Sequence, residues 1–262
     1  MTNIHTIFAN WSDDQISLLR RHGIVVERGY YNLSIEENDA YWKVKPYFDR
    51  WNVSDNVITK FSEQEVDEAN LLIFLSPWAN GYPMPDSDFG YRKTTYDDTN
   101  FCSNCGIGLK QKEPFRLKKV PNWGKRKMFS LNWVFDELFI RKSLYENLFE
   151  PMDVQTEEVL LYKKETLIDD ALQLKIPEID ISLVLDGYPF QICRQCNRNR
   201  YDLITAGYFP PFETKVKNRQ IFKSKEWFGT GASARKYIFI SAELRKKLVI
   251  SNVDGNYIPC AD

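Results

Sequence analysis

Apolar and polar positions alternate along the first 75 residues in a way that predicts short strands and short helices in turn. Brief aliphatic or β-branched runs indicate strands, whereas apolar residues at helical spacing behind a Ser or acidic cap indicate helices. The expected elements are a strand at Ile4–Ala9, a helix from Ser12 to Gly23, a strand at Ile24–Val26, a helix within Glu36–Trp51 that contains Pro46, an extended segment at Val57–Lys60, a helix from the capping box Ser62–Glu65 to Asn70, and a strand at Leu71–Leu75.

Residues 77–100 break this pattern with prolines, glycines and interspersed tyrosines. Such a segment favours turns, and its aromatic side chains favour packing onto a neighbouring region. We therefore place a boundary here and expect an acidic α/β region at 1–95 and a second domain at 96–262.

The second region mixes helical and extended patterns. An apolar, aromatic run at Phe129–Phe139 predicts a helix beginning near Asn132. The remaining expected elements are a helix at Ser143–Phe149, strands at Glu158–Tyr162, Leu172–Ile176 and Ile179–Leu185, a tight turn around Gly229 and Gly231, a strand at Tyr237–Ile240, a helix capped by Ser241, and a final strand at Tyr257–Ile258.

Four of the five cysteines form two C-x-x-C pairs, Cys102 with Cys105 and Cys193 with Cys196, separated by residues 106–192. One such pair places two thiolates on one ion, and two pairs complete a closed tetrahedral site. We expect a single structural Zn held by these four residues. Two unrelated pairs of buried thiols, a disulfide or a redox dithiol are the alternatives. Cys260 is left over and is taken as incidental.

The residue after each pair supports this interpretation. A sulfur knuckle curls its backbone around the ion, and the residue after the second cysteine then adopts a left-handed conformation. Gly106 and Asn197 occupy these positions, and both residue types tolerate that conformation. We therefore expect an α+β protein in which a zinc-ribbon-containing domain carries a large insertion between its two knuckles.

Composition limits the function classes. The chain is 43% hydrophobic and 15% aromatic, which favours a packed core over disorder. No secretory signal or membrane-length apolar run is apparent, and paired cysteines suit a reducing compartment, so a cytoplasmic location without membrane contact is expected. The net charge of −1 divides into −7 over residues 1–100 and +6 over residues 101–262.

No catalytic motif is evident. The two histidines, His5 and His22, lie outside the cysteine region, and no nucleophile motif accompanies them. The adjacent carboxylates Asp136-Glu137, Glu157-Glu158 and Asp169-Asp170 are of a kind common on solvated faces. The sequence therefore favours a non-catalytic binding protein with no catalytic residues and no organic cofactor.

A basic stretch leaves nucleic-acid binding open. Cations here could contact phosphates, or could balance the negative charge of zinc bound by four thiolates. The basic residues are Lys110, Lys112, Arg116, Lys118, Lys119, Lys125, Arg126 and Lys127, with Arg194, Arg198 and Arg200 beside the second pair.

Beyond the cysteines, the chain ends with the stretches Phe239–Leu244 (FISAEL) and Gly255–Pro259 (GNYIP). With the two C-x-x-C pairs, these stretches make residues 100–262 resemble the bacterial double-CxxCG-motif family of predicted immunity proteins. Asn197 departs from that family's second glycine. The resemblance implies a zinc-binding protein that neutralises a secreted polymorphic toxin by direct binding to this protein partner. A zinc-ribbon nucleic-acid-binding protein is the alternative.

Overall fold

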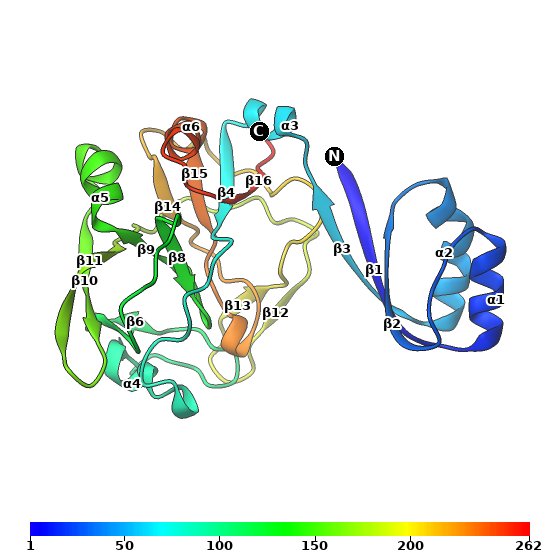
Figure 1. Ribbon diagram of the computed structural model, residues 1–262, viewed down its shortest axis with the longest axis horizontal. Coiled ribbons are helices and arrows are strands. Elements are labelled where there is room, and N and C mark those ends of the chain that lie inside the picture. Colours follow the sequence, from blue (N-terminus) through cyan, green and yellow to red (C-terminus); the bar gives the residue numbers. More distant parts are fainter. The chain divides into compact units, whose positions relative to one another are not determined.

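The computed structural model describes all residues from Met1 to Asp262, which form two compact units. Unit 1 comprises Met1–Glu68 and Ile204–Tyr208, and unit 2 comprises Ala69–Leu203 and Phe209–Asp262. Both units combine helices with β-sheet, so the predicted α+β class is confirmed (Figure 1). None of the helices has the length and apolar character that crossing a lipid bilayer requires.

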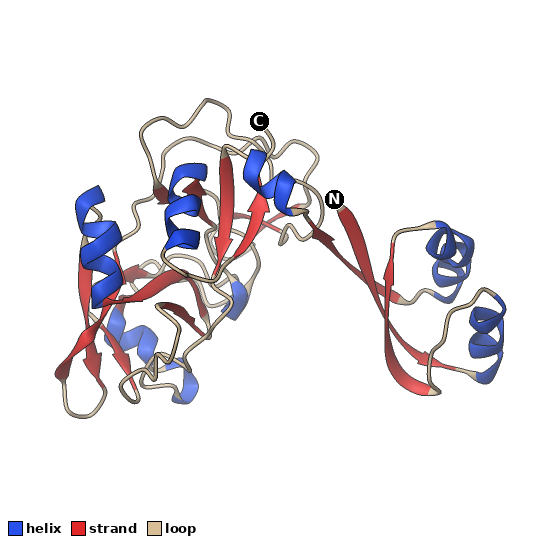
Figure 2. Cartoon of the chain, turned by 45° about the horizontal axis from the view of Figure 1, so that its top comes forward, coloured by secondary structure: helices blue, strands red, loops and turns tan.

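Unit 1 is built on a three-stranded antiparallel sheet with the order β2–β1–β3. Two helices, α1 and α2, lie on one face of this sheet (Figure 2). Alternate residues of β1, including Ile7 and Trp11, are buried against them, as the two-residue period of a strand requires. The elements are β1 (Thr2–Trp11), α1 (Asp13–Arg21), β2 (Gly29–Glu36), α2 (Asp39–Trp51), β3 (Ser54–Lys60) and α3 (Glu63–Glu68).

The predicted helix caps of unit 1 are confirmed, whereas one predicted strand is wrong. Ser12 and Gln15 form a reciprocal capping box at the start of α1, and Ser62 accepts a hydrogen bond from the Glu65 backbone at the start of α3. Ile24–Val26 forms no strand. The side chains of Ile24 and Val26 are buried in the core, so β-branched residues here serve packing without pairing in a ladder.

Unit 2 contains a five-stranded sheet with the order β7–β10–β11–β9–β8. Its core is aromatic: Phe129 stacks on Phe139 at a ring-centroid distance of 5.2 Å, and Phe115 meets Phe139 edge-on. The strands are β7 (Phe115–Leu117), β8 (Met128–Leu131), β9 (Val134–Arg141), β10 (Thr156–Leu161) and β11 (Thr166–Leu174). The whole sheet therefore lies between the two cysteine pairs in sequence, where a large insertion was predicted.

A second sheet of unit 2 has the order β14–β15–β4–β16. Its strands are β14 (Ile221–Lys223), β15 (Ile238–Ser241), β4 (Leu71–Leu75) and β16 (Asn256–Pro259). Ile73 of β4 pairs with Phe239 on one side and with Ile258 on the other, so β4 is an interior strand. Its continuous apolar sequence reflects this position, because both faces of an interior strand can be buried.

The division between the units therefore falls at 68/69, before the boundary that the sequence suggested at 95/96. Residues 77–95 join unit 2 through backbone hydrogen bonds: Asn80 N–H donates to Ser130 O, and Met84 N–H donates to Arg116 O. Trp78 packs edge-on against Phe129. Aromatic content in this segment thus marks attachment to the second unit.

The helix predicted from Asn132 is wrong. β8 and β9 form an antiparallel hairpin there, and Trp133 in the turn has φ = +67°. All of β8 and the consecutive residues Leu138, Phe139 and Ile140 of β9 are buried, so the sequence is apolar without strict alternation and resembles a helical pattern. Ile179–Leu185 also forms no strand beyond an isolated bridge at Leu183.

The other elements of unit 2 are short. They are η1 (Ser87–Phe89), α4 (Tyr91–Thr95), β5 (Tyr96–Asp97), β6 (Lys110–Gln111), α5 (Lys142–Leu144), η2 (Tyr145–Phe149), η3 (Glu150–Met152), β12 (Phe190–Ile192), β13 (Asn199–Tyr201), η4 (Gly231–Ser233) and α6 (Ala242–Ile250). Ser241 caps α6 as predicted, because its side chain accepts a hydrogen bond from Leu244 N–H.

Candidate metal centre

The two C-x-x-C segments fold into loops with the same hydrogen-bond pattern. In the first knuckle, Gly106 N–H donates to Cys102 O at 2.8 Å and Cys102 N–H donates to Ile107 O at 2.9 Å. In the second, Asn197 N–H donates to Cys193 O at 2.8 Å and Cys193 N–H donates to Arg198 O at 3.0 Å. Each loop is thereby closed on itself, with its two sulfurs on the inner side.

The conformation predicted for the residue after each pair is confirmed. Gly106 has φ = +81° and Asn197 has φ = +57°, both in the left-handed region. This turn reverses the backbone so that both cysteine side chains of a knuckle point the same way. The sequence signal and the geometry therefore agree at both knuckles.

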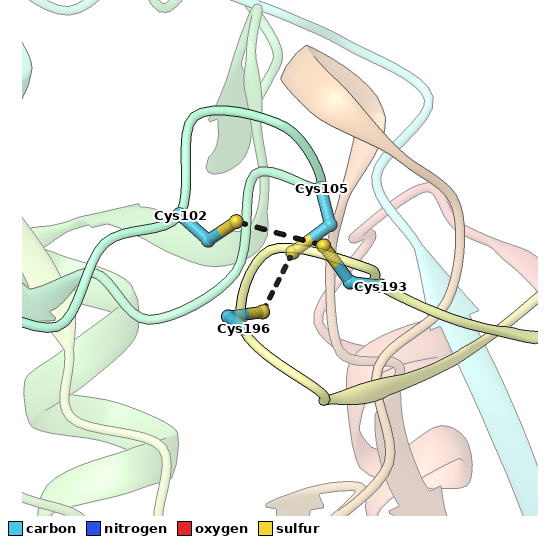
Figure 3. A group of neighbouring side chains, drawn as sticks. All are labelled: Cys102, Cys105, Cys193 and Cys196. Atoms are coloured by element: carbon cyan, nitrogen blue, oxygen red, sulfur yellow. Dashed lines mark hydrogen bonds between the residues drawn. The ribbon is translucent and has the colours of Figure 1, made fainter.

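All four sulfurs converge, and their Sγ atoms lie within 4.8 Å of one another (Figure 3). The Sγ atoms of Cys102 and Cys193 are 3.6 Å apart, as are those of Cys105 and Cys196. A tetrahedral ion with metal–sulfur bonds of about 2.3 Å places its ligands about 3.8 Å apart, close to these separations. The four sulfurs are thus placed to hold one metal ion.

The distances between the sulfur atoms also exclude a disulfide and two unrelated pairs of thiols. A disulfide needs its sulfurs at about 2.05 Å, so the cysteines are free thiols. The sulfurs approach across the knuckles, which excludes two unrelated pairs in distant parts of the fold. The fifth cysteine, Cys260, lies in a buried position outside the cluster.

Two polar side chains that were not assigned to the site connect the knuckles. Asn104 Nδ2 donates to Cys193 Sγ at 3.3 Å, from the first knuckle to the second. The Arg198 guanidinium donates to the carbonyls of Asn100, at 2.7 Å, and of Ile107, at 3.1 Å. Groups around a metal site commonly orient its ligands through hydrogen bonds. Asn104, inside the first C-x-x-C pair, and Arg198, shortly after the second, could have been predicted as such groups from their polar side chains and positions.

The thiols of this centre differ in acidity. The hydrogen bond from Asn104, with backbone N–H groups of Cys196 and Gln195, lowers the pKa of Cys193 to about 6. Burial and the neighbouring cysteine side chains raise the pKa of Cys105 to about 12. Without metal, the cluster at neutral pH therefore holds a thiolate at Cys193 and a thiol at Cys105.

The remaining chain packs tightly against the knuckles. Ile107 is buried with the cysteines, and Trp227 and Ala234 pack on the same cluster. Gly231 N–H donates to Cys105 O at 3.0 Å, so the first residue of η4 lies against the first knuckle. This contact gives the glycine-rich segment at 229–231 a structural role.

The two histidines are separate from this centre. His5 is buried in unit 1, where its Nδ1 lies 2.9 Å from Asp55 Oδ2 and its ring stacks on Tyr41. His22 is the C-cap residue of α1, in accord with its position before Gly23.

The paired carboxylates do not all lie on a solvated face. Glu157 and Asp170 pair with the exposed cations Lys175 and Arg141, as expected there. Glu137, in contrast, is largely buried, with a side chain 12% exposed, and pairs with Lys223, which corrects the interpretation of Asp136-Glu137.

Comparison of the chain with protein-family models, with curated proteins and with solved structures finds no match. The resemblance to the double-CxxCG-motif family therefore stays a prediction from the quoted motifs. The class that the site itself defines is an α+β protein with a four-cysteine centre that could hold a metal ion.

Gly106→Ala is expected to abolish stoichiometric metal binding. A Cβ at this position would lie 2.0 Å from Gly231 O, in addition to the left-handed strain of roughly 1–2 kcal/mol. Gly124→Ala is the matched control, because Gly124 also has positive φ but nothing lies within 4 Å of its added Cβ. For both variants, the metal content per chain and the free energy of unfolding from chemical denaturation are measured. Equal metal retention in the two variants would contradict the close approach at Gly231.

Metal binding at pH 7.5 is expected to release at least one proton but fewer than four per ion. Cys105 must lose its proton to bind, whereas Cys193 has already lost its own, since its pKa is lowered to about 6. Affinity should fall as pH falls, and further once Cys193 becomes protonated below about pH 6. Calorimetry in buffers of different ionisation enthalpy counts the protons. Release of all four would contradict the thiolate at Cys193.

Proposed function

We propose that the protein is a non-catalytic, zinc-stabilised binding protein, and that it acts as a bacterial immunity protein that neutralises a cognate toxin by direct binding. The observation that carries this proposal is the convergence of four cysteine sulfurs. An ion held by four thiolates has no open position for water or substrate, so it stabilises the fold without taking part in a reaction.

Zinc is the metal that this donor set favours. Four thiolates in a tetrahedral arrangement select zinc or an iron–sulfur centre among the common metals. Two knuckles with matching hydrogen bonds, of which the second joins the antiparallel strands β12 and β13, support a zinc ribbon. Cys102, Cys105, Cys193 and Cys196 would be its ligands.

The second knuckle also offers a surface suited to a protein partner. Phe190 and Ile192 of β12 are 53% and 58% exposed, directly before Cys193. Large apolar side chains on a rigid support are the usual anchors of protein interfaces. The charge of −7 over residues 1–100 would favour approach of a basic toxin, such as a nuclease.

Nucleic-acid binding is the second candidate. Lys118 and Lys119 are exposed and lie together, which favours it. Other basic side chains are engaged within the protein: Arg116 pairs with Glu165, Arg126 lies over the Trp78 ring, and Lys127 donates to Ser251 O. This engagement leaves fewer cations for phosphates, so we rank a protein partner first.

A search of the neighbouring genes for a secreted toxin, followed by co-expression of the two proteins, tests the proposal. The wild-type protein is expected to restore growth and to form a stable complex, and Phe190→Ser with Ile192→Ser to weaken that complex at least about tenfold without changing stability. Val120→Ser is the control, since Val120 is equally exposed elsewhere. Cys102→Ser should lose both metal and complex.

A different set of results would contradict the immunity proposal and support nucleic-acid binding. Absence of any complex, together with DNA or RNA binding that falls steeply with salt and is lost in the Lys118, Lys119, Arg126 and Lys127 variants, would replace the first candidate by the second.

A further inference from the structure

Unit 2 contains a cavity of about 180 Å³ whose lining is unusually rich in charge. Asp136 and Glu137 of β9, Lys223 of β14, and Glu178 and Lys236 face it. The rest of its wall includes the aromatic side chains of Tyr96, Trp133 and Trp227, together with Lys110 and Gln111. None of the four cysteines lines this cavity, and neither do Phe190 and Ile192 of the surface proposed for a protein partner.

The charges are buried deeply enough that stability does not explain them. Lys223 and Lys236 are each only 7% exposed, and both engage carboxylates, Lys223 with Glu137 and Lys236 with Glu178. Removing such pairs from water costs several kcal/mol per ion, and apolar residues of similar volume are often as stabilising. Buried charges around a cavity are more typical of a ligand site.

The two ion pairs are not equivalent. Glu137 and Lys223 are both nearly inaccessible, and Gln173 further fixes Glu137 through a hydrogen bond of 3.0 Å. In the other pair the Lys236 side chain is 8% exposed, whereas that of Glu178 is 59% exposed. Glu178 can therefore regain water when an incoming anion replaces it on Lys236, so that the buried ammonium group keeps a partner throughout.

Asp136 provides the complementary charge. Its Oδ2 accepts a hydrogen bond from Lys236 N–H at 3.4 Å, which is long for a carboxylate acceptor. The carboxylate is thus available for a stronger donor, such as an ammonium group. Asp136 and Lys236 both line this small cavity, so an acidic and a basic side chain face the same enclosed space.

Size restricts the ligand further. A cavity of about 150 Å³ accommodates benzene, so this one fits a molecule of roughly six to nine non-hydrogen atoms. A ligand with a single charge would use only one of these two groups. An acidic and a basic group around so small a space match a molecule that itself carries both charges.

We propose that this cavity binds a small zwitterion of the amino-acid class. The ligand carboxylate takes the place of Glu178 on Lys236 Nζ, and its ammonium group donates to Asp136. Its small side chain contacts the aromatic wall at Tyr96 and Trp133. The Glu137–Lys223 pair forms a fixed part of the lining.

The metal centre supports this site. Trp227 and Ala234 line the cavity and also pack on the cysteine cluster, and Gly106 of the first knuckle lines the cavity as well. Lys236 Nζ lies 5.2 Å from the centre of the Trp227 ring. A chain without metal would lose this wall, so binding is tested on the metal-loaded full chain.

Calorimetric titration of the zinc-loaded chain with small amino acids, including glycine, alanine, serine and aspartate, tests the proposal. At least one is expected to bind saturably with Kd below about 1 mM. The matched half-ligands of alanine, ethylamine and propionate, should bind at least about tenfold more weakly. Absence of saturable binding by every zwitterion would overturn the proposal, as would equal binding of the half-ligands.

Three variants locate the site. Asp136→Asn and Lys236→Met should each weaken binding at least about tenfold, whereas Glu178→Gln should strengthen it, because Lys236 loses its competing carboxylate. Lys225→Met is the control, since Lys225 pairs with Asp180 on the surface. If Lys236→Met does not fold, the ligand affinities of Asp136→Asn and Glu178→Gln decide whether the ligand binds in this cavity. Unchanged affinity in both, or weaker binding in Glu178→Gln, would refute the site.

Discussion

The four-sulfur centre is the constraint on which unit 2 depends. Cys102 and Cys193 are 91 positions apart, yet their sulfurs meet at 3.6 Å. The free energy of structural zinc binding, about 10–16 kcal/mol, is comparable with the whole stability of a typical domain, about 5–15 kcal/mol. An ion at this point would therefore decide whether the knuckles, the five-stranded sheet between them and the loop over Gly106 form one body.

The cavity and the proposed partner surface both derive from that centre. Trp227 connects the cysteine cluster to the charged cavity, and β12 leads from the exposed Phe190 into the second knuckle. Rigid support keeps side chains in place for binding and reduces the entropy lost when a partner or ligand docks. The proposed roles thus share one physical requirement, which is an intact metal centre.

The metal site could be predicted from the residue types close to it in sequence. The parts of the fold that depend on long-range packing could not. The left-handed turns at Gly106 and Asn197 follow from the residue types, and so do the caps at Ser12 and Ser241. The hairpin at Trp133 was missed because runs of consecutive buried residues in β8 and β9 remove the alternation that identifies strands. Glu137 and Lys223 lie 86 positions apart, so nothing in the sequence indicates their pairing or the cavity beside them.

X-ray absorption at the zinc edge of the purified full chain, combined with metal analysis, tests the central claim most directly. We predict one zinc per chain surrounded by four sulfurs at about 2.3 Å and no nitrogen or oxygen ligand. A substoichiometric metal content, or a first shell with fewer than four sulfurs, would contradict a closed centre shared by Cys102, Cys105, Cys193 and Cys196.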